Sequence, residues 1–286
     1  MEIRTSCHIG RTNSTGRHNS RTGIDYQKTK NSNINPERSG ANLYWDCQSE
    51  QLHTGEAPDF AEVERKTYED LLTEGLEAQH RRNAKNRHSE RNRTINDILT
   101  DRRTRPDEII LQVGDRDAQQ ALQQASRRPE AIDIIMARIM KDSIMMMIND
   151  FQNDSGEGFY PIDAALHRDE ESQHIHVRGV YIAQDKEGYM VANQKKALQA
   201  LGYDRPDPDK PEGRYNNPKL TFTADFQQRF NDLVKDFIRE HVRTDWIQVA
   251  EIRHDTDAQH LDTPDYKTRQ QAIERARATR EQDPER

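Results

Sequence analysis

The chain has few cysteines, few aromatic residues and no long hydrophobic run. Its two cysteines among 286 residues, Cys7 and Cys47, lack the paired spacing of a zinc site. They are also too few for a disulfide framework, which favours a reducing compartment. No stretch of about 18 apolar residues occurs, so a transmembrane helix is not expected. The opening residues, MEIRTSCHIG, contain no apolar core of a signal peptide. We therefore expect a cytoplasmic protein without direct membrane insertion.

Apolar residues are also scarce overall. They make up 32% of the chain, whereas charged residues make up 33%. Since so polar a chain cannot bury all of its length in a core, part of it should form an exposed arm or tail. The residues that follow WIQVAEI are almost wholly polar. We expect one domain over residues 1–250 and a charged tail, helical or disordered, over residues 251–286.

The net charge of -7, from 43 basic and 50 acidic residues, argues in bulk against a nucleic-acid partner. Phosphate binding requires lysine and arginine. The charges are unevenly distributed, however, because residues 81–105 (RRNAKNRHSERNRTINDILTDRRTR) carry nine basic side chains and only three acidic ones. This basic run is either a nucleic-acid contact or a solvated helical face.

Helix-like and strand-like segments are interspersed along the chain, as is typical of an α+β protein. Residues 10–40 are rich in Asn, Ser, Thr, Gly and Arg and predict a loop or extended arm. Helical composition or periodicity predicts helices, and short apolar or alternating runs predict strands. The expected helices are 61–93, 129–150, 194–202 and 223–243, and the expected strands are 1–9, 108–114, 158–168 and 174–184.

Three histidines are concentrated in ALHRDEESQHIHVRGVYI, residues 164–181. His174 and His176 are two residues apart on a predicted strand and so project from the same face. His167 ends the preceding strand, and an antiparallel turn would bring it close to both. Three neutral imidazoles on one face form a metal site with open positions. Glu170, in the turn, is a candidate fourth ligand or base. The alternative is a polar edge strand with incidental histidines.

The segment HRDEESQHIH resembles the H-x-D-E-x-x-P-H-x-H motif of the MobV-type plasmid mobilisation relaxases (the Pre/Mob plasmid recombination family), which belong to the HUH endonuclease superfamily. Gln173 stands where the family has proline, which should alter the turn without removing a ligand. The segment RHNSR is similar to the family's N-terminal H-N-x-R motif. The resemblance extends over roughly residues 1–225. Its further parts are INPERSGANLYW at 34–45, RHSERNRTINDIL at 87–99 and residues 197–222.

The resemblance implies a fold, a reaction and a partner. The fold would be the HUH relaxase fold, a central antiparallel sheet of about five strands flanked by helices. Such enzymes nick one DNA strand at an origin of transfer, remain covalently attached to its 5′ phosphate, and rejoin the ends. The partner would be single-stranded or supercoiled DNA at that origin. A coupling protein, an accessory protein of the relaxosome and a second copy of the chain are further candidate partners.

The resemblance also implies roles for individual residues. His167, His174 and His176 would bind Mn²⁺ or Mg²⁺, and Glu170 would lie beside the metal as ligand or base. His18 would be the nucleophile, and Arg21 would contact the scissile phosphate or hold the loop. The residues expected to contact DNA are Tyr44, Arg21 and Asn19. The chemistry agrees with a histidine nucleophile, because a neutral imidazole is competent near pH 7.

Several readings remain open at the level of sequence. Tyr44 or Tyr26 could be the nucleophile, although a phenol with a pKa of about 10 needs more activation. A rolling-circle replication initiator is disfavoured because the segment QKKALQALGY lacks a tyrosine at the required internal spacing. The sequence is also compatible with a non-catalytic protein that binds an origin or promoter, and with a zinc hydrolase of small molecules.

Overall fold

The structure, a computed structural model, describes residues 2–11, 16–25, 34–125, 131–153, 156–242 and 247–252. The predictions made for Tyr26 and for nearly all of the tail fall outside these residues. None of the described helices combines the length and the apolar character needed to cross a bilayer.

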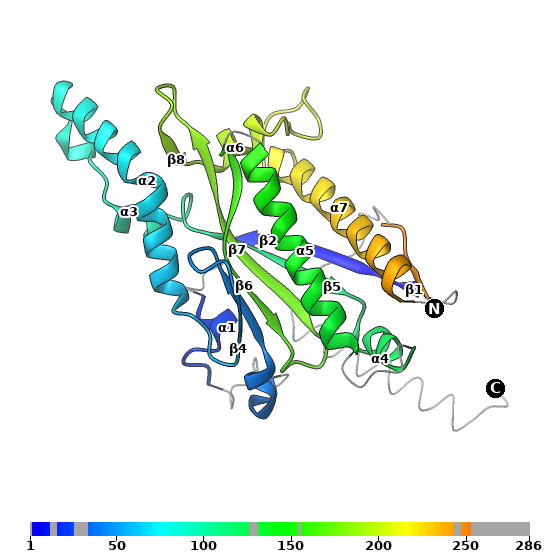
Figure 1. Cartoon of the computed structure of the whole chain (residues 1–286). Coiled ribbons are helices and arrows are strands. Elements are labelled where there is room, and N and C mark those ends of the chain that lie inside the picture. The colour runs from blue at the N-terminus through cyan, green and yellow to red at the C-terminus, as the bar shows by residue number, and fades with distance from the viewer. Residues whose placement is uncertain are drawn as a thin grey trace.

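A seven-stranded antiparallel sheet forms the centre of the molecule (Figure 1). Its strand order is β2-β5-β7-β6-β3-β4, and β8 pairs with β7. The bounds are β2 (Thr5–Arg11), β5 (Asp107–Val113), β7 (His174–Gln184), β6 (Gly158–His167), β3 (Leu43–Asp46), β4 (Leu52–Thr54) and β8 (Met190–Ala192). A separate parallel pair joins β1 (Glu2–Ile3) to β9 (Gln248–Val249). The predicted α+β class is confirmed. The strand number exceeds the expected five because β3, β4 and β8 are too short to show periodicity.

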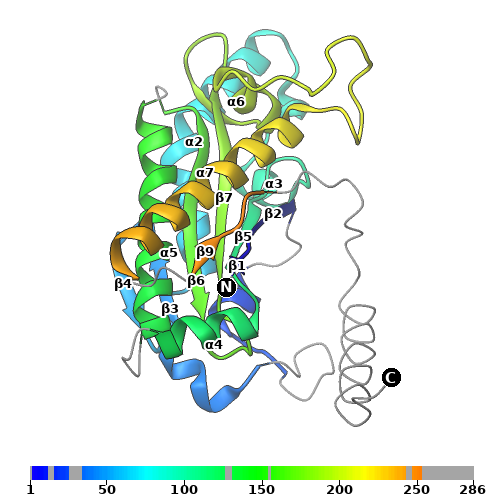
Figure 2. The same cartoon turned by 90° about the vertical axis from the view of Figure 1, so that its right-hand side faces the viewer.

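Helices cover both faces of the sheet, as Figures 1 and 2 show from two directions. Their bounds are α1 (Arg17–Ser20), α2 (Phe60–Lys85), α3 (Ile95–Thr100), α4 (Arg116–Ala125), α5 (Ala131–Asn153), α6 (Gln194–Ala200) and α7 (Pro218–His241). Among the described residues there are also two 3₁₀ helices, η2 (Pro36–Ala41) and η3 (Ser89–Arg91). The last predicted helix therefore begins earlier than expected, at Pro218. Proline in the first turn presets the helical φ angle without losing a needed N–H group.

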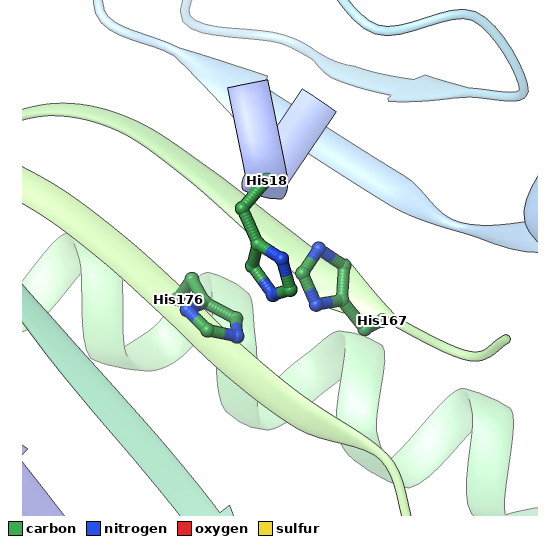
Figure 3. Close-up of side chains that lie close together, drawn as sticks. All are labelled: His18, His167 and His176. Atoms are coloured by element: carbon green, nitrogen blue, oxygen red, sulfur yellow. The ribbon is translucent and has the colours of Figure 1, made fainter. Parts of the chain in front are cut away.

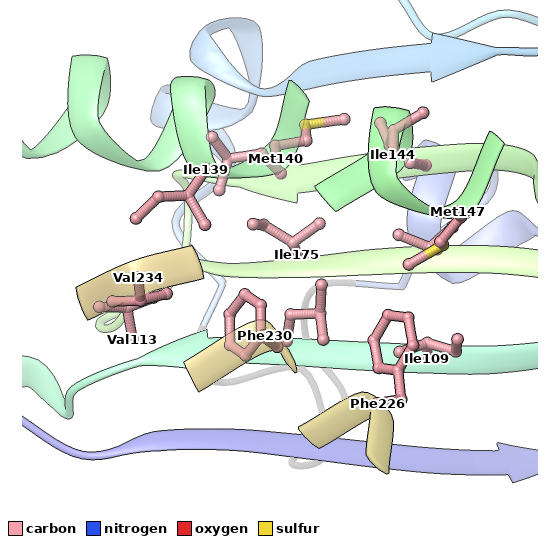
Figure 4. Packing of buried hydrophobic residues seen from close by; sticks show 14 of the residues in the cluster. Ile109, Val113, Ile139, Met140, Ile144, Met147, Ile175, Phe226, Phe230 and Val234 are labelled. Atoms are coloured by element: carbon pink, nitrogen blue, oxygen red, sulfur yellow. The ribbon is translucent and has the colours of Figure 1, made fainter. Parts of the chain in front are cut away.

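One face of the sheet is apolar and packs against α5 and α7 (Figure 4). Ile109 and Ile175, from alternate positions of β5 and β7, are fully buried there. They meet Met140 of α5 and Phe226 and Phe230 of α7 (Figure 4). Each such side chain stabilises the fold by about 1.5–3 kcal/mol through removal of apolar surface from water. This apolar core fixes the strand register and so determines which residues point to the opposite face.

The opposite face is divided into an apolar part and a polar part. At one end, α2 and α3 cover a small apolar cluster that includes Tyr68, Leu72 and Val180. At the other end, α1 lies over polar side chains of β5, β6 and β7. The predicted helix 61–93 ends at Lys85, and the next two residues, Asn86 and Arg87, form its C-terminal turn, in which Arg87 has a φ of 58°.

A buried ion pair separates the two parts. Arg178 and Asp163 are completely buried, and Arg178 donates through Nε to Asp163 Oδ1 over 2.9 Å. Its Nη1 lies 2.7 Å from Glu64 Oε2. Gly16, the residue before α1, rests directly on this guanidinium: a Cβ there would come within 2.8 Å of Arg178 Cζ. Its φ of 71° also favours glycine. The start of α1 therefore packs directly against the Arg178–Asp163 ion pair.

Candidate functional site

The short helix α1 carries His18 into contact with the histidines of the sheet (Figure 3). The His18 ring centroid lies 5.4 Å from that of His167 and 5.5 Å from that of His176. The prediction that residues 10–40 form only loop or arm is therefore wrong for residues 17–20, and likewise for residues 10–11 at the end of β2 and 36–40 in η2. A helix of one turn cannot be stable by propensity alone, so tertiary contacts must hold it.

Two contacts of Asn19 fix α1 on the sheet. The backbone oxygen of Asn19 accepts a hydrogen bond of 3.1 Å from His167 Nε2. Its side-chain amide donates to Glu108 Oε1 over 2.9 Å. Asn19 is fully buried. The segment that carries His18 is thus bound to both β5 and β6.

The pairing of β6 with β7 gathers the three predicted histidines as expected. His167 is directly opposite His174, and His176 is opposite Ala165, one pair further along the same face. The ring centroids are 5.4 Å apart for His167 and His174, 4.6 Å for His167 and His176, and 4.7 Å for His174 and His176.

Each imidazole uses one nitrogen as a donor to a group that can only accept. His176 Nδ1 lies 3.0 Å from Glu108 Oε1, and His174 Nδ1 lies 3.0 Å from the backbone oxygen of Ser172. His167 Nε2 donates to Asn19, as described above. These partners assign the tautomers and leave a lone pair on His176 Nε2, His174 Nε2 and His167 Nδ1.

The free nitrogens meet the requirements of a metal site. His176 Nε2 is buried and has no hydrogen-bond partner among the described residues. An orphaned buried acceptor of this kind is costly unless a ligand or ion satisfies it. Glu170 Oε1 lies 3.5 Å from His167 Nδ1, and Glu170 Oε2 lies 3.8 Å from His174 Nε2. Three nitrogens and a carboxylate fit a divalent cation.

The donor atoms form two overlapping groups, each within 4.8 Å. One group contains His18, His167 and His176, and the other contains His167, Glu170 and His174. The predicted metal triad is therefore spread over both groups, with His167 common to them. The structure also adds His18 to the cluster.

The protonation states suit metal binding near neutral pH. Burial lowers the pKa of His176 to about 3 and that of His167 to about 4. Burial likewise lowers the pKa of His18 to about 4. All three rings are uncharged at pH 7. Burial would raise the pKa of Glu170, but its contacts with His167, His174 and Arg21 lower the pKa below its usual value, so it is ionised.

Arg21 joins α1 to the turn between β6 and β7. Its Nε and Nη2 donate to Asp169 over 2.9 and 2.6 Å, and Nη2 also lies 2.7 Å from Glu170 Oε1. Its Nη1 donates to the backbone oxygen of His18 over 3.2 Å. Of the two predicted roles for Arg21, holding the loop therefore corresponds to bonds present in the structure.

Asp169 is a partner that sequence reasoning did not select. It is buried and accepts hydrogen bonds from Arg21, from Ser39 Oγ over 2.7 Å and from Asn42 Nδ2 over 2.9 Å. Its position between His167 and Glu170 was the available signal. Asp169 thus ties η2, the start of β3 and α1 to the turn that carries Glu170.

The three residues expected to contact DNA, Tyr44, Arg21 and Asn19, are all buried. Tyr44 is 1% exposed, and its ring lies edge-on to Phe60 with centroids 6.1 Å apart. Asn19 is occupied as described above. In this arrangement, none of the three side chains presents much surface to a DNA strand, because the Arg21 guanidinium is likewise held by Asp169 and Glu170. The Tyr44 hydroxyl is also poorly placed to act as a nucleophile.

Glu108 was missed because nothing in the sequence of β5 marks it. Burial would raise its pKa, but its bonds to His176 and Asn19 lower the pKa to about 2. One carboxylate oxygen of Glu108 thus orients both the ring of His176, a candidate metal ligand, and α1, the helix that carries His18. When a hydrogen bond that orients a metal ligand is lost, the affinity for the metal commonly falls by 10–100-fold.

We expect Glu108→Ala to weaken Mn²⁺ binding about 10–100-fold, measured by calorimetric titration. Glu108→Gln should bind nearly as the native protein does, because its amide oxygen still accepts from His176 and Asn19. The matched control is Glu171→Ala, which removes a nearby carboxylate whose side chain is 72% exposed. Equal affinities for the Ala variant and the native protein would exclude an orienting role for Glu108.

No family model and no curated protein matches the chain. Two similar solved structures are Mn-bound crystal structures of the MobM relaxase domain (MOBV; Mob_Pre) with plasmid pMV158 oriT DNA. The one at pH 6.8, with 22 nucleotides and a 3′ thiophosphate, shows 14% identity and a TM-score of 0.44, covering 94% of this chain and 99% of that one. The one at pH 5.5, with 22 nucleotides, shows 13% identity and a TM-score of 0.44, covering 93% and 99%.

Proposed function

We propose that the chain is a metal-dependent DNA relaxase. It would nick a single strand at a specific origin of transfer through a covalent link to the 5′ phosphate, and then rejoin the ends. The observation that carries the proposal is the position of His18. The uncharged imidazole of His18, from the N-terminal segment, contacts the rings of His167 and His176. These rings lie beside His174 and Glu170, and together the four side chains suit a divalent cation. Phosphoryl transfer requires a nucleophile that can attack phosphorus and positive charge beside the phosphate oxygens.

His167, His174, His176 and Glu170 would hold the Mn²⁺ or Mg²⁺ ion. When bound, the ion would supply positive charge that polarises the scissile phosphate and orients it. Glu108 and Asn19 would keep the imidazoles in the tautomers that bind a cation. Arg21, through Asp169 and Glu170, would hold α1 so that His18 keeps its place.

His18 would attack through Nε2. Arg21 Nη1 lies 3.4 Å from this nitrogen, and a guanidinium only donates, so Nε2 carries the lone pair. In the step, a bond forms between Nε2 and phosphorus while the bond from phosphorus to the 3′ oxygen breaks. The 3′ oxygen leaves with the electron pair and takes up one proton, which the phosphorylated ring can release from Nδ1 through solvent. Attack by the 3′ hydroxyl in the reverse direction would rejoin the strand.

The test is relaxation of a supercoiled plasmid that carries the DNA upstream of the protein's own gene. With Mn²⁺, we expect open circles that retain bound protein after denaturation, and with EDTA none. The same DNA bound tightly but left uncut in every divalent metal would contradict nicking and favour a non-catalytic DNA-binding protein.

A further inference from the structure

A second charged site lies at the other end of β7, away from the histidines. It is a cleft of about 390 Å³ between the α3–β5 connection and the segment from β8 to α6. These elements lie at the end of the sheet from which α2 projects (Figure 1). We infer that this cleft binds the phosphate backbone of DNA that flanks the nick. The inference rests on the proposed function and adds a second contact region to it.

The cleft is lined by three basic side chains and one acid. Arg93 and Arg103 come from one wall and Lys195 from the other, and Asp101 lies between the two arginines. Asp101 pairs with Arg93 at 3.1 Å and with Arg103 at 3.4 Å. Lys195 pairs with Glu212 at 2.5 Å. The pairs made by Arg103 and Lys195 are weak in water, because the Arg103 side chain is 81% exposed and that of Lys195 is 56% exposed. A phosphate can therefore replace the carboxylates.

The wall of the cleft that carries Lys195 is attached to the rest of the fold by several contacts. The Asn193 side chain caps α6 by accepting from the backbone N–H of Lys196 over 3.0 Å. Gln194 donates to the buried carboxylate of Asp107 over 2.9 Å, and Lys219 of α7 lies 2.6 Å from the same oxygen. This side of the cleft is thus attached to both β5 and α7. Basic side chains on two facing walls, one of them attached in this way, suit contacts with the phosphates of a DNA backbone.

The register of the sheet gives the distance to the histidines. Ala192, which lines the cleft, is paired with Ile182, six positions beyond His176 on β7. At about 3.3 Å per residue, the cleft lies about 20 Å from the histidine cluster. With about 3.4 Å per nucleotide along a strand, this separation corresponds to about six nucleotides. DNA held at His18 would therefore reach the cleft about half a helical turn away.

An exposed aromatic side chain lies in the loop that is joined to the cleft by the Lys195–Glu212 pair. Tyr215 is 81% exposed and stands at the tip of a turn closed by pairing of Gly213 with Asn216. The Asn216 amide bonds to three backbone oxygens and rigidifies the turn. The guanidinium of Arg214 lies 5.4 Å from the Tyr215 ring centre. An aromatic ring with an adjacent cation is a stacking surface for an unpaired base. Glu212, which pairs with Lys195, links this turn to the cleft.

The test compares DNA binding by two paired variants in EDTA, so that metal plays no part. The probe is a fluorescein-labelled hairpin oligonucleotide with a single-stranded arm, taken from the DNA upstream of the gene, and the readout is anisotropy over a range of salt concentrations. We expect R103A/K195A to bind about tenfold more weakly and to lower the salt slope by about two, since two phosphate contacts are lost. The control is R138A/R239A, which removes exposed arginines on α5 and α7, on the other face of the sheet.

Tyrosine substitutions test stacking separately. Tyr215→Phe should bind the hairpin as the native protein does, whereas Tyr215→Ala should bind at least threefold more weakly. An unchanged affinity and salt slope for R103A/K195A, or an equal loss in R138A/R239A, would overturn the cleft assignment. Failure of the relaxase proposal is a different outcome, in which the native protein binds the probe but nicks no plasmid with Mn²⁺.

Discussion

We expect His18→Ala to abolish plasmid nicking, with a rate reduced at least about 10³-fold, and to leave no covalent protein–DNA adduct. The substitution removes the atom that forms the bond to phosphorus, and the lone pairs of the neighbouring imidazoles of His167 and His176 would be taken up by the metal ion. Alanine is tolerated in a helix, and the residues that anchor α1 are Asn19 and Arg21 rather than His18. The variant should therefore fold and still bind DNA.

The discriminating variant is Tyr44→Phe. It keeps the buried ring and its edge contact with Phe60, and removes only the hydroxyl. If His18 is the nucleophile, this variant should retain the adduct on denaturing gels. An adduct that persists in His18→Ala and disappears in Tyr44→Phe would reverse the assignment and require Tyr44 to leave its buried position.

The second large effect is expected from His176→Ala, which should weaken Mn²⁺ binding at least about 100-fold. His176 Nε2, like His167 Nδ1, is a buried nitrogen without a hydrogen-bond partner among the described residues, so a cation would be its natural partner. In the native protein, a metal at a hundred times its Kd should raise the free energy of unfolding by about 2.7 kcal/mol. For a chain of this size, that corresponds to an increase in Tm of about 5–10 °C.

The variant should show no such increase in Tm when Mn²⁺ is added. His176 is buried, so its loss alone also costs stability, and the informative quantity is the difference between Tm with and without metal. His174→Ala provides a milder version, because the His174 side chain is 16% exposed. The metal site would be excluded if both variants gained as much Tm from Mn²⁺ as the native protein.

The α+β class and much of the histidine cluster were predictable from the sequence, because both depend on local periodicity. Alternation over residues 174–184 places His174 and His176 on one face, and the turn after His167 makes the pairing antiparallel. The alternate apolar residues of the same strand, Ile175 and Val177, then face the core. A period of two is a property of the strand itself, so no knowledge of distant residues was required.

The position of His18 relative to this cluster was decided by tertiary structure. Residues 10–40 show no apolar periodicity, and the one-turn helix α1 depends on partners far along the chain. Arg21 reaches Asp169 across 148 positions, and Asn19 reaches Glu108 across 89. Such partners are single polar residues with no repeating pattern to mark them.

Burial had the same dependence on the whole fold. The sequence shows that Tyr44 is an aromatic residue near an apolar segment, but only the packing of β3 against β6 and Phe60 removes its ring from solvent. Likewise, the pKa values of His167 and His176 are lowered by the residues that surround them. The sequence by itself determined which side chains share a face of β7. The fold decided which of them are uncharged and which distant groups they meet, because burial and long-range contact depend on all of the packed elements together.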